Sequence, residues 1–177
     1  FSLTVTGRAS HAGAAPEEGL SAIEELARQV LRLHGFSDPE VGTTVNVGVV
    51  KGGTRSNVVA ARASARIDVR AKTQAEADRI TEVIRGLNPF QPEAKVTVKG
   101  GFGRGPMERT PEIVALFETA RRLAAGMGLD LEESASGGGS DGNFSAALGV
   151  PTLDGLGAVG DGAHAEHEYI EVASLPE

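Results

Sequence analysis

The stretch from Gly137 to Tyr169 combines a glycine run with loop histidines, and both are residue types that can do chemistry. It begins Gly-Gly-Gly-Ser-Asp-Gly-Asn-Phe, and a glycine run before a short helix lets backbone N–H groups converge on an anion or a developing oxyanion. It ends in a loop with His164, where an imidazole can bind a metal ion or carry a proton. Neither feature is sufficient by itself, so other parts of the chain must supply the remaining groups.

His164 on its own does not predict a metal site. A lone loop histidine is more often hydrogen-bonded to the backbone, and His164 and His167 do not have the His-Glu-x-x-His spacing of a helical zinc motif. Zinc needs at least three protein ligands, and the chain contains no cysteine. Any metal must therefore be held by histidine and carboxylate side chains, of which Asp154, Asp161 and Glu166 are possible members.

A serine hydrolase is a remote alternative. Residues 138–142 fit the Gly-x-Ser-x-Gly pattern around Ser140, and Asp154 or Asp161 and then His164 follow in the order of an α/β-hydrolase. That fold places its acid and histidine after separate strands, whereas only one strand fits between Ser140 and His164. Ser140 and Asp141 are explained equally well as the N-cap of a helix.

The first hundred residues predict the element order β-α-β-β-α-β. Residues 2–6, 45–49, 59–70 and 95–99 alternate apolar and polar positions as strands do. One helix is opened by Pro16 and closed by Gly35, and another runs from Thr73 to Leu87. This order is ferredoxin-like, with both helices on one face of an antiparallel sheet. We therefore expect an α+β fold for residues 1–105.

The first predicted helix carries one apolar stripe, formed by Leu20, Ile23, Ala27, Val30, Leu31 and His34. His34, near the C-terminus of that helix, is expected to be partly buried with a structural role. His11 lies in a small-residue loop that would let a substrate approach. A row of arginines along one strand indicates a solvated face, although such a row can also hold a carboxylate.

Residues 106–177 predict an incomplete α/β unit. After a Gly- and Pro-rich linker at 100–110, the pattern indicates helices at 111–127 and 143–148. Strands are expected at 129–133, 150–153 and 169–172, an alternation typical of a parallel, doubly wound sheet. This segment is too short to close such a layer, so it should expose apolar surface.

Composition excludes several classes of partner. The net charge of −7 and the aromatic content of 4% argue against nucleic acid, which requires a basic face. No segment resembles a membrane span or a signal peptide. A cytoplasmic location is an assumption that does not follow from the sequence. The chain begins at Phe1 inside a strand pattern and ends in a Ser-x-x-Glu capping box without a following helix. We therefore expect a fragment of a longer polypeptide.

Five motifs in order resemble the zinc-dependent aminoacylase and carboxypeptidase family of metallopeptidases, most closely its glutamate carboxypeptidase branch. The motifs are Thr6-Gly-Arg-Ala-Ser-His-Ala-Gly13, Ser56-Asn-Val-Val59, Asp68-Val-Arg70, Gly137-Gly-Gly-Ser-Asp141 and His164 with Glu168-Tyr169. The resemblance covers essentially the whole chain.

The resemblance implies a two-domain enzyme. Residues 1–105 would be a ferredoxin-like lid and dimerisation domain, and residues 106–177 the C-terminal portion of an α/β zinc-peptidase catalytic domain. Members of the family cleave amide bonds next to a free carboxylate, in small peptides or N-acyl amino acids. Two zinc ions activate a water, a glutamate acts as general base, and the enzyme is a homodimer through the lid.

The resemblance also implies roles for individual residues. His164 would be a zinc ligand, and His11 would reach into the partner subunit's site to stabilise the tetrahedral oxyanion. The other zinc ligands and the general base would lie before Phe1, so the chain alone is expected to be inactive. A non-catalytic dimerisation or binding module is the alternative from another class. The implied substrate-binding residues are Asn57, Arg70, Arg104 and Gly139.

Overall fold

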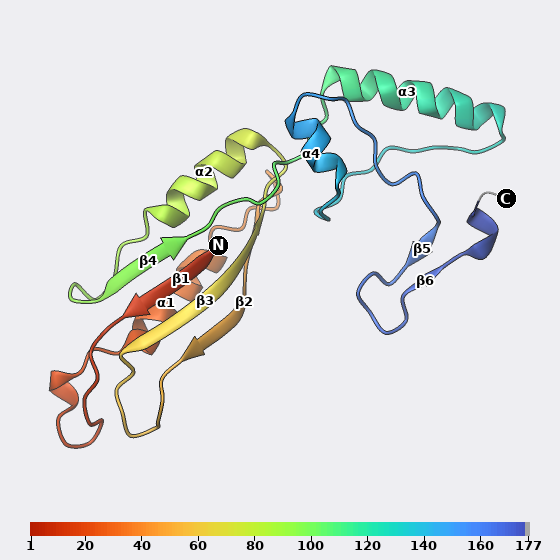
Figure 1. Cartoon of the computed structure of the whole chain (residues 1–177). Helices are drawn as coiled ribbons and strands as arrows, with labels where there is room; N and C mark the ends of the chain where they lie inside the picture. The colour runs from red at the N-terminus through yellow and green to blue at the C-terminus, as the bar shows by residue number, and fades with distance from the viewer. Residues whose placement is uncertain (176–177) are drawn as a thin grey trace. The chain divides into compact units, whose positions relative to one another are not determined.

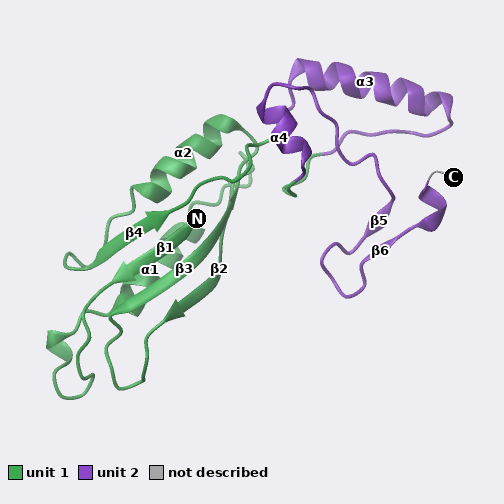
Figure 2. Cartoon of the chain, in the orientation of Figure 1, with its two compact units in different colours: residues 1–108, 135–139 green, residues 109–134, 140–177 purple. Residues whose placement is uncertain are grey.

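The structure is a computed structural model that describes residues 1–175. The chain divides into two compact units, which Figure 2 colours separately. The first unit contains residues 1–108 and 135–139, and the second contains residues 109–134 and the described residues from 140 onward.

An antiparallel sheet of four strands forms the first unit, in the order β2-β3-β1-β4. The strands are β1 (Ser2–Thr6), β2 (Thr44–Gly52), β3 (Arg62–Arg70) and β4 (Lys95–Lys99). Helix α1 (Ala22–His34) connects β1 to β2, and helix α2 (Gln74–Arg85) connects β3 to β4 (Figure 1). The predicted β-α-β-β-α-β order is confirmed, although β3 begins at Arg62 and not at residue 59.

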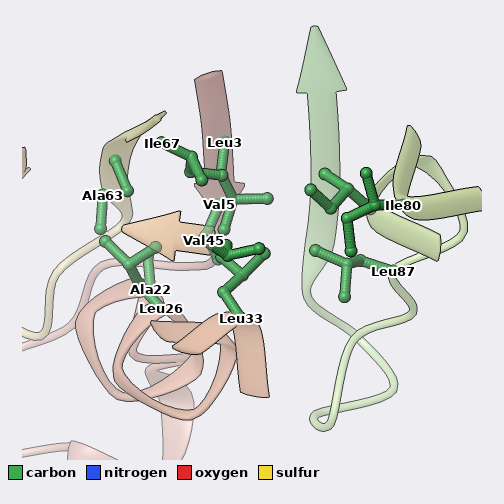
Figure 3. Packing of buried hydrophobic residues seen from close by; sticks show 12 residues of the cluster. Leu3, Val5, Ala22, Leu26, Leu33, Val45, Ala63, Ile67, Ile80 and Leu87 are labelled. Atoms are coloured by element: carbon green, nitrogen blue, oxygen red, sulfur yellow. The ribbon is translucent and has the colours of Figure 1, made fainter. Parts of the chain in front are cut away.

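A single core joins both helices to one face of this sheet. Leu3 and Val5 of β1 are fully buried, since alternate residues of a strand point to the same face. Figure 3 shows them beside side chains of β2, β3 and α1, with Ile80 of α2 in the same cluster. The opposite face carries the polar positions of the strands. Its central residues are Ser2, Thr4 and Thr6 of β1, which pair with Arg66, Ser64 and Arg62 of β3.

Helix α1 begins later than the sequence predicts. Pro16–Glu18 form only a short 3-10 helix, η1, which ends at Gly19. The α-helix starts after Ser21, whose Oγ accepts a hydrogen bond from the Glu24 N–H as an N-cap. A Cβ at Gly19 would lie 2.4 Å from Ser10 Oγ, so a close loop crossing separates the two helical segments.

Most of the apolar stripe that the sequence predicts for α1 lies on the exposed side of the helix, although Val30 of that stripe is partly buried and packs against the core. Ile23, Ala27 and Leu31 are exposed, and so is His34, for which the sequence predicts partial burial. The side that packs on the sheet carries a different set, in which polar residues lie among apolar ones: Ala22, Glu25, Leu26, Gln29 and Leu33. The interior accepts Glu25 and Gln29 because the Glu25 carboxylate and Gln29 Nε2 find hydrogen-bond partners there, whereas Gln29 Oε1 is buried without a partner among the described residues.

The second unit combines one helix of 16 residues with short elements and has little interior. Helix α3 (Pro111–Gly126) is capped by Thr110, and α4 (Gly142–Ala147) follows the glycine run. Strands β5 (Gly160–Asp161) and β6 (Tyr169–Ile170) pair as a short hairpin, and a 3-10 helix, η2 (Val172–Ser174), follows. Neither α3 nor α4 contains a buried residue. The expectation of exposed apolar surface is confirmed, with Leu123, Met127, Leu148 and Val172 each more than half exposed.

The parallel strands that the sequence predicts in this unit are not formed. Residues 129–133 and 150–153 have no strand structure, and the predicted terminal strand is reduced to Tyr169–Ile170. A strand exists only through hydrogen bonds to a neighbouring strand. The described residues 109–134 and 140–175 offer no such neighbour to either segment.

Candidate functional site

His11 and Asn57 are neighbours at one end of the sheet. The loop after β1 and the loop between β2 and β3 lie at this end (Figure 1). The Ala12 N–H donates to the Asn57 carbonyl at 3.0 Å, and His11 forms an isolated antiparallel bridge with Val58. The first candidate group therefore consists of His11 and Asn57, both exposed.

The His11 ring is fixed by its own loop. Its Nδ1 atom accepts hydrogen bonds from the backbone N–H groups of Gly13 at 3.1 Å and Ala14 at 3.0 Å. The loop in turn is closed by the Ala15 N–H, which donates to the His11 carbonyl at 3.0 Å. An imidazole held in this way faces solvent with a defined orientation.

Arg70 lies at the opposite end of β3, at its last residue. Its Nε donates to Asp68 Oδ2 at 2.8 Å, and the two side chains share a face because they are two residues apart on the strand. Its Nη1 donates to the carbonyl of Gly137, at the start of the glycine run. Arg70 thus links the end of the sheet to residues 135–139.

Arg104 lies against the same glycine run. An ideal Cβ built on Gly139 would lie 3.5 Å from Arg104 Nη1, so the guanidinium packs directly on this residue. The structure therefore brings together three of the sequence-predicted site residues, Arg70, Arg104 and Gly139. Two guanidinium groups beside a glycine backbone can bind a carboxylate through charge-assisted hydrogen bonds.

The two groups of candidate residues are far apart in one chain. Asn57 precedes β3 and Arg70 ends it, and the strand between them runs from Arg62 to Arg70. Eight residue steps at the usual rise give about 26 Å. A dipeptide extends only about 7 Å. One small substrate therefore cannot contact both groups of the same chain.

His164 belongs to the second unit, in the turn between β5 and β6. Its φ of 67° is positive, and no other non-glycine residue in the described part of the chain has a positive φ. A non-glycine residue in this region is strained, and such strain often occurs at functional sites. The side chain is exposed, and the His164 N–H donates to Glu168 Oε2 at 3.3 Å. The imidazole is therefore presented to solvent and is not packed into an interior.

The described residues do not hold a metal ion by themselves. Within residues 1–175, no three histidine, aspartate or glutamate side chains are grouped as a metal site would require. His164 fits as one ligand only, so the described part of the chain does not complete a zinc centre.

Ser140 does not have the surroundings of a hydrolase nucleophile. Its Oγ accepts a hydrogen bond from the Gly142 N–H at 2.9 Å, and its N–H donates to Asn143 Oδ1 at 3.0 Å. A nucleophile elbow requires a strand immediately before the serine. Residues 129–139 contain no strand, so Ser140 closes a local turn before α4.

Two contacts of the site do not follow from the sequence motifs. Asp68 is part of one of these motifs, but the motif does not predict its hydrogen bond to Arg70 Nε. A signal is present in the sequence, because residues two apart on a strand lie on one face. The carbonyl of Gly137 is a partner that only the folded backbone reveals.

Comparison with known proteins identifies relatives along the whole chain. The M20 peptidase dimerisation domain family matches residues 1–88. Carboxypeptidase G2 from Pseudomonas sp. (strain RS-16) is 33% identical over 98% of this chain and 43% of its own length. A p-aminobenzoyl-glutamate hydrolase chain of Escherichia coli (strain K12) is 30% identical over 80% of this chain and 33% of its own length. This chain spans less than half the length of these relatives.

Solved structures give the same result for the fold. A tripeptidase from Staphylococcus aureus subsp. aureus Mu50 has a TM-score of 0.69 and 27% identity, covering 94% of this chain and 44% of its own. Aminopeptidase PepT from Bacillus cereus ATCC 10987 has a TM-score of 0.70 at 24% identity, covering 98% and 46%. No helix within residues 1–175 is long and apolar enough to cross a membrane. The chain belongs to the M20 peptidase family, and its first 88 residues are the dimerisation domain of that family.

Proposed function

We propose that this chain is the lid and part of the catalytic domain of an M20 metallohydrolase, of the glutamate carboxypeptidase or N-acyl-amino-acid deacylase type. In this assignment residues 1–105 are a ferredoxin-like lid. Residues 106–177 are the C-terminal portion of an α/β catalytic domain. The antiparallel order β2-β3-β1-β4 supports the first part, and the relatives along the second half of the chain support the other.

The proposed substrate carries a free carboxylate next to the amide bond that is cleaved. Arg70 and Arg104 bind this carboxylate, and the Gly139 backbone contacts the substrate beside them. Support comes from the position of both guanidinium groups against residues 137–139. The names of two relatives, a carboxypeptidase and a p-aminobenzoyl-glutamate hydrolase, point to the same class of substrate.

The observation that carries the proposal is the separation of the two residue groups. Because one strand of about 26 Å lies between them, a complete site requires His11 and Asn57 from one copy with Arg70 and Arg104 from another. In such a dimer His11 of the partner subunit stabilises the oxyanion formed when the amide carbonyl is attacked. The match of residues 1–88 to a dimerisation domain is independent support.

The proposed dimer interface is the outer edge of β2 with the exposed stripe of α1. β2 is an edge strand whose outward N–H and C=O groups lack a neighbour within the described sheet. Ile23 of α1 lies against Gly52, the last residue of β2, and against Gly53 just after it, so the helix stripe and the strand edge are continuous. Leu31 is 77% exposed and Val50 of β2 is 56% exposed. A two-fold axis at this edge would bury both apolar surfaces and extend the sheet.

His164 contributes one imidazole to a metal centre in this proposal. The remaining ligands and the general base come from a segment that the relatives possess in their additional length. This chain by itself then hydrolyses no amide bond. A non-catalytic dimerisation or binding module is the second candidate, and the dimerisation domain match favours it equally.

A chimera tests the proposal directly. The 177 residues replace the matching segment of carboxypeptidase G2, and hydrolysis of p-aminobenzoyl-glutamate is measured with zinc present. We expect hydrolysis by the chimera, none by the isolated chain, and a strong loss in an Arg70→Ala chimera because the substrate carboxylate loses a charge-assisted hydrogen-bond partner. A chimera that forms folded dimers without activity would favour the non-catalytic module.

A further inference from the structure

The His11 imidazole has one of its two nitrogens occupied by backbone donors. Gly13 and Ala14 both direct their N–H groups at Nδ1, at 3.1 and 3.0 Å. A backbone N–H can only donate, so Nδ1 must act as an acceptor. In a neutral imidazole one nitrogen carries the proton and the other accepts. The proton of neutral His11 therefore resides on Nε2.

The backbone that supplies these donors is itself fixed on both sides. The Ala15 N–H donates to the His11 carbonyl at 3.0 Å, which closes the turn over residues 11–15. The Ala12 N–H donates to the Asn57 carbonyl, which ties the turn to the loop before β3. The two donors are thus part of the folded loop, and they do not depend on any side chain.

We propose that the turn of residues 11–14 is a tautomer-selecting device that holds neutral His11 in its Nε2–H form. With Nδ1 occupied and Nε2 protonated, the ring presents one hydrogen-bond donor to its surroundings. It then serves neither as a general base through Nε2 nor as a metal ligand. Gly13 and Ala14 are positioning residues, since they act only through the His11 ring.

The tautomer itself does not depend on the proposed function. Only its role, the stabilisation of an oxyanion, rests on that function. A tetrahedral oxyanion needs a hydrogen-bond donor aimed at it, and a donor that is already oriented costs no reorganisation during the reaction. Nε2–H is such a donor, whereas the Nδ1–H form would present an acceptor lone pair to the oxyanion and repel it. The turn therefore selects the one neutral form of His11 that can stabilise negative charge.

Nuclear magnetic resonance of the uniformly ¹⁵N-labelled 177-residue chain tests the proposal without any enzyme activity. A long-range ¹H–¹⁵N spectrum at neutral pH distinguishes the two tautomers by the shifts of the ring nitrogens, and a His11→Asn variant assigns the signals. We expect an acceptor-type Nδ1 and a protonated Nε2 for His11. We also expect scalar couplings across the hydrogen bonds from the Gly13 and Ala14 amide nitrogens to Nδ1.

His34 serves as the internal reference, because it is exposed and no hydrogen bond to its ring is found within residues 1–175. It should show the averaged pattern of an imidazole that exchanges between tautomers. An averaged pattern for His11 like that of His34, or a protonated Nδ1, would overturn the proposal.

Two loop variants separate the backbone donors from the general shape of the turn. Ala14→Pro removes one N–H donor, so His11 should move toward the averaged pattern and lose one coupling. Gly13→Ala keeps both N–H groups, and its Cβ would meet the His11 ring no closer than 3.7 Å, an ordinary contact. Its His11 pattern should equal that of the unmodified chain. Equal patterns in all three proteins would contradict the role assigned to the Ala14 donor.

A zinc titration of the chain and the activity assay of the chimera together distinguish a failure of this inference from a failure of the proposed function. One equivalent of zinc(II) should leave the His11 ring signals unchanged, and displacement of the Nε2 proton by the metal would overturn the inference. An inactive chimera would refute the hydrolase assignment while the tautomer result remained valid. Conversely, an active chimera with a protonated Nδ1 on His11 would refute the inference alone.

Discussion

Glu25 shows how a residue with an ordinary surface pattern becomes part of the interior. It is completely buried, although its sequence context is typical of a solvated helix face. Its carboxylate accepts hydrogen bonds from Gln29 Nε2 at 2.8 Å, from the Gln91 N–H at 2.8 Å and from the Phe90 N–H at 3.0 Å. Burial alone raises the pKa of this carboxyl, but the hydrogen bonds from Gln29, Gln91 and Phe90 outweigh it, so the pKa is lowered. The charged carboxylate therefore fastens the loop before β4 to α1.

Replacing Glu25 with glutamine should destabilise the first unit. The amide cannot accept all three hydrogen bonds, so a partly buried backbone N–H of Phe90 or Gln91 loses its partner at a cost of about 1–3 kcal/mol. Urea unfolding followed by circular dichroism measures the change. The matched control is Glu24→Gln, since Glu24 is exposed and pairs only with Arg28, and it should change stability by less than about 0.5 kcal/mol. Equal unfolding midpoints for both variants would contradict the role of Glu25.

The carboxylate of Glu76, in the first turn of α2, connects this helix to the start of β2. Glu76 accepts from Arg79 Nε at 2.7 Å and from Thr43 Oγ1 at 2.6 Å. The hydrogen bonds from Arg79 and then Thr43 lower the pKa of Glu76 to about 2. Thr43, just before β2, is fully buried, so this contact ties the helix to the sheet.

The first unit should lose stability in acid because of Glu76. A carboxyl with a lowered pKa in the folded state stabilises the protein above its unfolded pKa, and this contribution disappears as the pH falls through the folded pKa. The loss is expected between about pH 5 and pH 2 and amounts to about 1–2 kcal/mol, since Arg79 is half exposed and the pair is screened by solvent. Urea unfolding of the chain and of Glu76→Gln across this range measures it. A variant with an equally steep acid loss would refute the assignment.

Helix α1 shows what the sequence can and cannot predict about the elements. Strand alternation and helix caps predict the order of the first unit, because these signals are local. Periodicity also finds an apolar stripe on α1, but Ile23, Ala27 and Leu31 of that stripe face outward. The apolar pattern of the inner side is interrupted because Glu25 and Gln29 lie there beside Ala22, Leu26 and Leu33. Periodicity identifies an apolar surface that must be covered. It does not show whether the sheet of the same chain or a second chain covers that surface.

The second unit and the candidate site are predictable to different degrees. The apolar run 150–153 has strand composition, but a parallel strand requires neighbours, and none lies beside it within the described residues 140–175. The family resemblance predicts Arg70, Arg104 and Gly139 as substrate-binding residues, and the structure places both guanidinium groups against residues 137–139. Their separation from His11 depends on the length of β3 between two loops, which motif matching does not consider.

At the scale of the whole molecule, the exposed stripe of α1 predicts a two-fold dimer. Leu31→Glu should leave the fold intact, since the side chain is 77% exposed, but it should weaken association. Two-fold symmetry removes two leucines from the interface, a loss of about 3 kcal/mol that raises the dissociation constant by about 100-fold. Sedimentation equilibrium measures this constant. Leu148→Asp is the control, because Leu148 is 84% exposed in the second unit and its replacement should leave the dimer unchanged.

The separation of the two residue groups predicts complementation between inactive protomers of the carboxypeptidase G2 chimera. In the proposed dimer, His11→Ala and Arg70→Ala should each disable every site of their own homodimer, because each complete site takes His11 from one chain and Arg70 from the other. In a mixed dimer one site combines the intact Arg70 of one chain with the intact His11 of its partner, and the other site lacks both. Random mixing makes half of the dimers mixed, so activity should recover to about one quarter of the unmodified chimera. Recovery is measured after the two variants are unfolded and refolded together. Activity that stays at the level of the separate variants would mean that both groups serve one chain, which the length of β3 opposes.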